Sequence, residues 1–265
     1  MVRVSRTSRR SLVALLAVVA LATSACSGSS GTSTPSGTGS LATSAATQTG
    51  QDAANGGAGS ALGGAASNLA NITSYKFSMT LAGDPAASVM SIVGQDTSTA
   101  PVTYSGTVIV KPDKAADINL SGLHVIEIGG YDYMDMGSTG GFLRSTAQNP
   151  SLVDSLSPGQ MFSSMLDSAA VAGYNKVGSE SKSGVDADHY QASASALAEY
   201  GSIVGLPTAT WSGDIWIATN GGYPVSVSII AKAKDNSIAY EMLFDITNIN
   251  DAANQVTAPT DIVGA

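Results

Sequence analysis

Apolar and polar residues alternate in a series of short stretches between residue 74 and the C-terminus. Tyr75, Phe77, Met79 and Leu81 are each separated by one polar residue. A period of two is typical of a β-strand with one buried face. Comparable stretches predict further strands over residues 102–110, 118–128, 131–136, 142–144, 185–192, 210–218, 224–232 and 238–246. Gly-Gly and Asp-Asn pairs between several of them predict tight turns, and therefore an antiparallel meander.

A helical period interrupts this pattern after residue 150. Ser157-Pro158 predicts a helix N-cap followed by a proline at the first helical position, and Met161 and Met165 then fall on one face of the helix. Shorter helical stretches are predicted over residues 67–72 and 194–204. Strands interrupted by a few helices indicate an α+β fold. We expect a strongly curved antiparallel sheet, a half barrel, with the helices packed on its concave face.

The N-terminus has the order of a secretory signal peptide. Four arginines precede an apolar run that extends to Ala22 and is followed by small residues. The run is about 15 residues long, whereas a helix needs roughly 20 apolar residues to span a bilayer. We therefore expect the segment 1–25 to be cleaved. Ser8-Arg9-Arg10 resembles a twin-arginine signal, so the export route, Sec or Tat, stays open.

Cys26 is the only cysteine of the chain, and it follows directly after the signal. The run 21–26 (LATSAC) resembles a lipobox, in which the cysteine thiol carries a diacylglycerol. Thr23 departs from the Leu or Val that the pattern prefers. The alternative is an ordinary signal followed by a chance cysteine. Lipidation is favoured because a lone free thiol in an exported protein is open to oxidation, whereas a thioether is inert.

The segment that follows Cys26 contains almost nothing that could form a core. Residues 26–66 are rich in Ser, Gly, Thr and Ala, which is typical of a flexible linker. About 40 such residues give a root-mean-square reach of about 35 Å. The sequence thus predicts a signal peptide over 1–25, a lipidated cysteine with a linker over 26–66, and one folded domain over 67–265.

Charge narrows the range of partners. The chain has 12 basic and 20 acidic residues, and four of the basic ones lie in the signal, which leaves 8 against 20, a net charge of −12. A protein this acidic is not expected to bind nucleic acid, nor to dock electrostatically on anionic lipid headgroups. The lipid on Cys26 is then the predicted membrane attachment, on the extracytoplasmic face of the cell membrane.

Four short motifs carry a family likeness: residues 71–77 (NITSYKF), 184–190 (GVDADHY), 205–207 (GLP) with 214–217 (DIWI), and 222–225 (GYPV). They resemble the LolA-like half-barrel family, specifically the actinobacterial lipoproteins of the LppX/LprG kind. The likeness covers about residues 67–262, and Ala218 replaces the acidic residue usual after the third motif. It implies a half barrel whose apolar cavity holds acyl chains for lipid transport or presentation in the cell envelope. A membrane transporter of unknown identity is a candidate partner.

Candidate catalytic groups are few. His124 and His189 are the only histidines, and we interpret both as packed, hydrogen-bonded residues. No Gly-x-Ser-x-Gly elbow is present to hold a serine nucleophile. Strand alternation places Asp186 and Asp188 on one face and His189 on the other, which disfavours a metal site. We expect no enzyme activity, no metal and no cofactor.

Binding of an apolar ligand is the remaining function. Methionines are the most informative residues for it, because a flexible thioether adapts to acyl chains of different shapes. The candidate cavity-lining residues are Phe77, Met79, Met134, Met136, Met161, Met165, Met242 and Phe244. Tyr131, Tyr133 and Trp216 are candidates for hydrogen-bonding groups at the cavity mouth. The leading hypothesis is a lipoprotein that binds a lipid or another apolar ligand. The alternative is a cell-surface interaction or structural module with a closed core.

Replacing Cys26 with Ala tests the anchor. We expect the variant to leave the membrane fraction and to accumulate in the medium, because the remaining chain carries a net charge of −12 and has no other predicted membrane attachment. Cell fractionation followed by immunoblotting measures this. Retention of the variant in the membrane would contradict the anchoring role.

Overall fold

The computed structural model describes most of the chain beyond residue 51. The described residues are 52–87, 100–120, 122–135, 137, 140–147, 149–162, 166, 173–194, 196–197, 201 and 205–263. The predicted signal peptide, Cys26, Met136, Met165 and most of the helical stretch predicted over 194–204 lie outside them.

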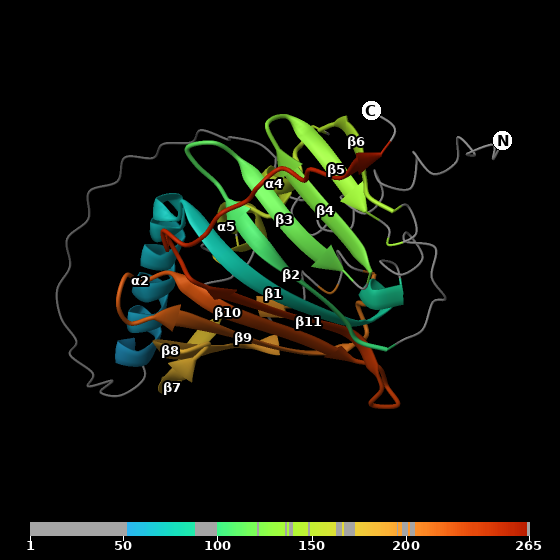
Figure 1. Ribbon diagram of the computed structural model, residues 1–265. Helices are drawn as coiled ribbons and strands as arrows, with labels where there is room; N and C mark the ends of the chain where they lie inside the picture. Colours follow the sequence, from blue (N-terminus) through green and yellow to red (C-terminus); the bar gives the residue numbers. More distant parts are fainter. Residues whose placement is uncertain are drawn as a thin grey trace, which may run out of the picture.

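One sheet of twelve strands dominates the described structure (Figure 1). The strands are β1 (Ser74–Gly83), β2 (Val102–Ile109), β3 (Ala115–Leu120), β4 (Leu123–Ile128), β5 (Tyr131–Asp135), β6 (Phe142–Thr146), β7 (Tyr174–Lys182), β8 (Val185–Ala192), β9 (Thr210–Ala218), β10 (Pro224–Lys232), β11 (Ile238–Thr247) and β12 (Ile262–Val263). Their spatial order is β12-β6-β5-β4-β3-β2-β1-β11-β10-β9-β8-β7. Neighbouring strands are thus mostly consecutive in the chain, as the predicted meander requires.

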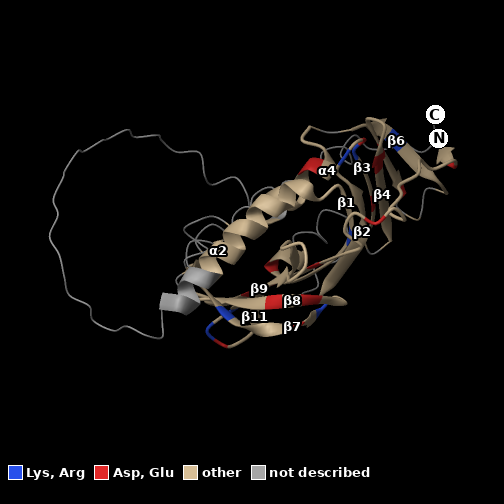
Figure 2. Ribbon diagram, turned by 90° about the vertical axis from the view of Figure 1, so that its left-hand side faces the viewer, with Lys and Arg blue, Asp and Glu red and all other residues tan. Residues whose placement is uncertain are grey.

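Every described strand pair is antiparallel except β12 with β6, which is parallel. Viewed from the side, the sheet bends from β6 at one end to β7 at the other (Figure 2). The helices include α2 (Asp52–Asn68), the 3-10 turn η1 (Leu69–Asn71), α4 (Leu152–Ser155) and α5 (Pro158–Phe162), and residues 84–87 are also helical. α2 crosses the open side of the curve. The predicted α+β half barrel is confirmed.

β1 occupies the centre of the sheet, between β2 and β11. Phe77 lies opposite Gly106 of β2 and Ile246 of β11. The predicted alternation is confirmed, because Tyr75, Phe77 and Met79 are buried whereas Lys76 between them is exposed. The face that carries Phe77 is the concave face, and it meets the helices.

The sequence prediction lacks β7, β12, α4 and most of α2, and it treats β3 and β4 as the one stretch 118–128. β7 is an edge strand with seven consecutive exposed residues, so nothing in it alternates between polar and apolar. β12 contains only two residues. α4 is a single turn that begins at Ser151, whose hydroxyl accepts a hydrogen bond from the Asp154 amide. Such a cap is common for serine, but four residues carry no readable period.

The predicted linker, residues 26–66, overlaps a helix of the folded domain. Residues 52–66 belong to α2, and Ala58, Leu62 and Ala65 are buried against the core. Their spacing of four and three residues places them on one helix face. The segment forms a helix because the sheet offers an apolar surface to that face, which composition alone does not reveal. No described helix is both long enough and apolar enough to span a membrane.

Gly106 permits a close approach of two strands near the centre of the curve. A Cβ atom at this position would lie 2.2 Å from the backbone oxygen of Asp117 in β3. No side chain fits there, and glycine in a strand is typical of a tight bend or a close backbone contact.

We expect Gly106→Ala to lower the free energy of unfolding by about 1–3 kcal/mol, because β2 and β3 must separate to admit the methyl group. Urea denaturation measures the change. Gly178→Ala in β7 is the matched control, since a Cβ there meets no atom within 4 Å. A Gly106→Ala chain as stable as the control would show that the strands yield without cost.

Candidate functional site

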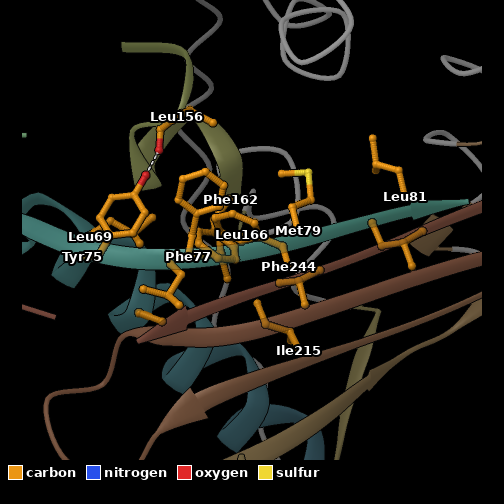
Figure 3. Close-up of a cluster of buried hydrophobic side chains, with 14 of the residues drawn as sticks. Leu69, Tyr75, Phe77, Met79, Leu81, Leu156, Phe162, Leu166, Ile215 and Phe244 are labelled. Atoms are coloured by element: carbon orange, nitrogen blue, oxygen red, sulfur yellow. Dashed lines mark hydrogen bonds between the residues drawn. The ribbon is translucent and has the colours of Figure 1, made fainter. Parts of the chain in front are cut away.

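The concave face of the sheet carries a continuous apolar cluster, which is the candidate site (Figure 3). Strand residues supply its floor: Tyr75, Phe77, Met79, Leu81, Tyr104, Val108, Ile118, Leu120, Tyr190, Ile215, Ile217, Val227, Ile229, Phe244 and Ile246. All are less than 9% exposed. Because side chains alternate between the two faces of a strand, each long strand contributes every second residue to this floor.

Short segments cover the floor. Leu62 of α2, Val153 of α4 and Phe162 of α5 are fully buried and belong to the same cluster. Leu197, in the connection between β8 and β9, approaches β9, where Gly213 leaves space for its side chain. The cover therefore consists of separate helical pieces and not of a second sheet.

Aromatic rings form the centre of the cluster. The ring of Phe244 lies 5.8 Å from that of Phe77 and 5.7 Å from that of Phe162. Tyr104 meets Phe77 edge to face at 6.2 Å. These separations are typical of favourable ring contacts. They connect β2, β1 and β11 of the floor with α5 of the cover.

Two tyrosine hydroxyls lie inside this apolar region. Tyr75 donates a hydrogen bond to the backbone oxygen of Leu156, at the end of α4 (Figure 3). Tyr104 donates to the sulfur of Met79 at 2.5 Å. Burial raises the pKa of both phenols, so each stays protonated and acts as a donor. A thioether is a weak acceptor, so the Tyr104 hydroxyl has a weaker partner than Tyr75 has.

Four of the predicted lining residues contribute to this cluster. Phe77, Met79 and Phe244 are among its buried members, and Met242 packs against it while partly exposed. Met134 lies opposite Val125 on the concave side of β5, outside the cluster. Met136 and Met165 lie outside the described residues, as does the side chain of Met161 in α5.

The structure corrects the hypothesis of a shared mouth, because Trp216 lies apart from Tyr131 and Tyr133, whose rings are 6.4 Å from each other. Trp216 packs on the convex face with Ala187, Ala218 and Val225. Tyr133 is buried with Ile126 and Phe142 in a further separate cluster, and Tyr131 is exposed under the Arg144 guanidinium. Both faces of β9 are apolar at this point, so alternation alone did not identify the face that Trp216 occupies.

Both histidines are packed and hydrogen-bonded, as predicted. The His124 Nε2 atom lies 2.8 Å from Asp117 Oδ1. The His189 ring stacks on Trp216 at 4.4 Å, and its Nε2 atom lies 2.8 Å from Asp214 Oδ1.

Asp188 does not join His189 in a shared site. It pairs with Lys176 and accepts a hydrogen bond from the Ser179 hydroxyl, and both of these residues are on β7. Among the described residues no group of three or more His, Cys, Asp or Glu side chains could hold a metal ion.

A buried acidic pair lies at one end of the concave face. Among the described residues, Glu127 and Asp132 are the only charged side chains that are buried. They lie directly opposite each other on β4 and β5. The Leu152 amide at the start of α4 donates to Glu127 Oε2 at 2.6 Å. Burial, with the nearby charge of Asp132, raises the pKa of Glu127, although the Leu152 bond opposes this.

The strand register explains how α4 is held. Tyr75, Val108, Ala116, Glu127 and Asp132 form one row across five strands. α4 lies over this row, with its first amide on Glu127 and the carbonyl at its end on Tyr75. A surface ion pair from Lys114 to Asp154, at 2.5 Å, adds a third attachment.

Three important residues are not among those that the sequence analysis identifies. Leu62 falls in the predicted linker, and the buried position of Glu127 is not predicted. Phe162 is missed although it directly follows Met161 in the predicted helix. Alternation in β4 does place Glu127 on the same strand face as Val125. An apolar residue at that position indicates a face that is buried, and Val125 is indeed buried.

No family model matches the chain, and the search of curated proteins finds no match. Among solved structures, the lipoprotein LppX of Mycobacterium tuberculosis is 15% identical with a TM-score of 0.48, over 75% of this chain and 98% of LppX. LprF of Mycobacterium bovis is 13% identical with a TM-score of 0.49, over 78% and 97%. The chain is similar to both in fold.

We expect Glu127→Gln to change the pH dependence of stability. A carboxyl whose pKa is raised on folding contributes stability below its unfolded pKa and loses it as the pH rises through the folded pKa. The wild-type chain should therefore gain stability relative to the variant as the pH is lowered from 7. Urea denaturation at several pH values measures the difference. Glu241→Gln on the convex face controls for the lost charge, and a pH-independent difference would contradict the expectation.

Proposed function

We propose that the chain is a lipoprotein, anchored at Cys26 on the extracytoplasmic face of the membrane, that binds a lipid or another apolar ligand on the concave face of its half barrel. Transport or presentation of lipid in the cell envelope is the biological role that the sequence resemblance implies. The observation that carries the proposal is the construction of the apolar cluster, whose floor is one curved sheet and whose cover is a set of short, separately attached segments.

The construction of the cover supports a binding role. Acyl chains bind through apolar area and need few polar contacts. The floor supplies aliphatic and aromatic side chains together with the thioether of Met79. A cover made of separate pieces can be displaced without breaking the sheet, because α2, α4 and α5 contribute no strand hydrogen bonds.

Charge and position support the membrane anchor. The chain beyond the signal carries a net charge of −12, so a lipid on Cys26 would supply the attachment that electrostatics does not. Residues 27–51 would then separate the anchor from α2. By random-coil scaling, about 25 residues reach about 28 Å.

A closed interaction module is the second candidate function. The contacts of Phe244 with Phe77 and Phe162 favour it, because these rings fill the centre of the concave face. In that case the domain would present its surface to a protein partner and would hold no ligand.

Extraction of the purified chain tests the two functions against each other. The secreted Cys26→Ala chain is extracted with organic solvent and the extract is analysed by mass spectrometry. A binding protein is expected to yield stoichiometric lipid, or to take up a fluorescent fatty acid after the lipid is removed. A chain that yields no lipid and takes up no fatty acid would refute the proposal and favour the closed module.

Two adjacent residues of β11 provide a matched test of which face of the sheet binds the ligand. Met242 packs on the concave cluster, and Leu243 lies on the convex side with similar partial exposure. We expect Met242→Gln to weaken fatty-acid binding by about tenfold, because an amide is then placed against an acyl chain. Leu243→Gln should leave binding unchanged. Fluorescence titration measures both, and equal effects would contradict binding on the concave face.

A further inference from the structure

α2 is a helix of low intrinsic stability. Five of its 17 residues are glycine, and its only large apolar side chain is that of Leu62. Each glycine lowers the helical equilibrium about fivefold relative to alanine. An isolated segment with this composition would be largely unfolded. α2 is therefore helical because it is docked on the domain.

Apart from Leu62, the described apolar contacts of α2 come from small side chains. Ala58, Leu62 and Ala65 are buried, and Ala61 and Ala66 pack partly exposed against the same cluster. At its C-terminal end the Asn68 amide donates to the backbone oxygens of Gly221 and Gly222, at 3.0 and 3.1 Å. α2 otherwise lies beside β7, the exposed edge strand.

The opposite side of α2 is open. A Cβ atom at Gly63 or at Gly64 would meet no atom within 4 Å. Alanine would fit at either position without any contact. These glycines serve no packing purpose, and their effect is to keep the helix weak.

α4 differs from α2 in how it is attached. Its two ends are bonded to Glu127 and Tyr75 of the sheet, and its Asp154 pairs with Lys114. Of these two covering helices, α2 is thus the one that relies on small apolar contacts, on Asn68 and on a poor helical sequence. It is also the covering element nearest in sequence to the predicted anchor.

We propose that α2 is the gate of the concave site, and that it undocks and unfolds locally to let an apolar ligand enter and leave. This inference rests on the proposed function, since it specifies how the same site is reached. Undocking would remove Leu62 from the cluster and expose the side chains beneath it, while the twelve-stranded sheet stays intact.

Hydrogen exchange on the full chain carrying Cys26→Ala tests the opening itself. With the native α2 sequence, the α2 amides should exchange through a local opening, well before the strand amides of β1 and β11. Gly63→Ala with Gly64→Ala should lower the opening constant of α2 about twentyfold and raise its protection by the same factor. Exchange of α2 only through global unfolding would overturn the proposal.

Ligand kinetics test the gate. The probe is a fatty acid with a fluorescent polyene chain, mixed with the same chains in a stopped-flow instrument. The double alanine variant should take up and release the probe about twentyfold more slowly, with unchanged affinity, because a stabilised cover slows both directions equally. Leu62→Ala, which removes the large buried side chain of α2, should accelerate both rates, with the melting temperature confirming that the sheet is folded.

Gly159→Ala in α5 is the matched control, because it also lies in a covering helix and has open space at the Cβ position. It should leave both rates unchanged. If it slows them while the α2 variant does not, the ligand enters beside α5 and the proposal fails. Unchanged rates in the α2 variant overturn the gate alone, since the wild-type chain still binds. Absence of uptake by every chain refutes the proposed function and the gate together.

Discussion

The apolar concave face of a single curved sheet must be covered, and the rest of the molecule follows from this requirement. Burial of Phe77, Met79 and Phe244 is favourable only if other apolar groups exclude water from above them. A flat sheet could recruit a second sheet for this purpose. A strongly bent one leaves a narrower space, which single helical turns and one longer helix fill from within the curve.

The covering segments solve the same problem with different chemistry. α4 is oriented by polar contacts at both ends, and one of them places a backbone amide against the buried carboxylate of Glu127. α2 presents Leu62 and alanines, and the described side-chain hydrogen bonds that hold it to the sheet come from Asn68. A cover with unequal attachments has a preferred place to open, without any change in the floor beneath it.

The sequence predicted the strands well wherever one face is buried, because alternation is then strict, as in β1 and β11. It failed for β7, whose residues are exposed on both faces at the sheet edge. It failed for α2, because glycine and alanine resemble a linker until Leu62 meets the cluster. Within the site, Phe77 and Phe244 could be placed by parity, whereas Trp216 could not, since Ile215 and Ile217 make both faces of β9 apolar.

The centre of the sheet is built from the two ends of the domain. β1 is the first strand and β11 is the last long one, so the partners Phe77 and Ile246 are separated by about 170 residues of chain. Closing this loop costs conformational entropy, which grows slowly with loop length, before the contact between β1 and β11 forms. During synthesis, β1 must therefore wait for nearly the whole chain to emerge before its second neighbour exists. The domain matures late, and its apolar strand is the segment that most needs protection until then.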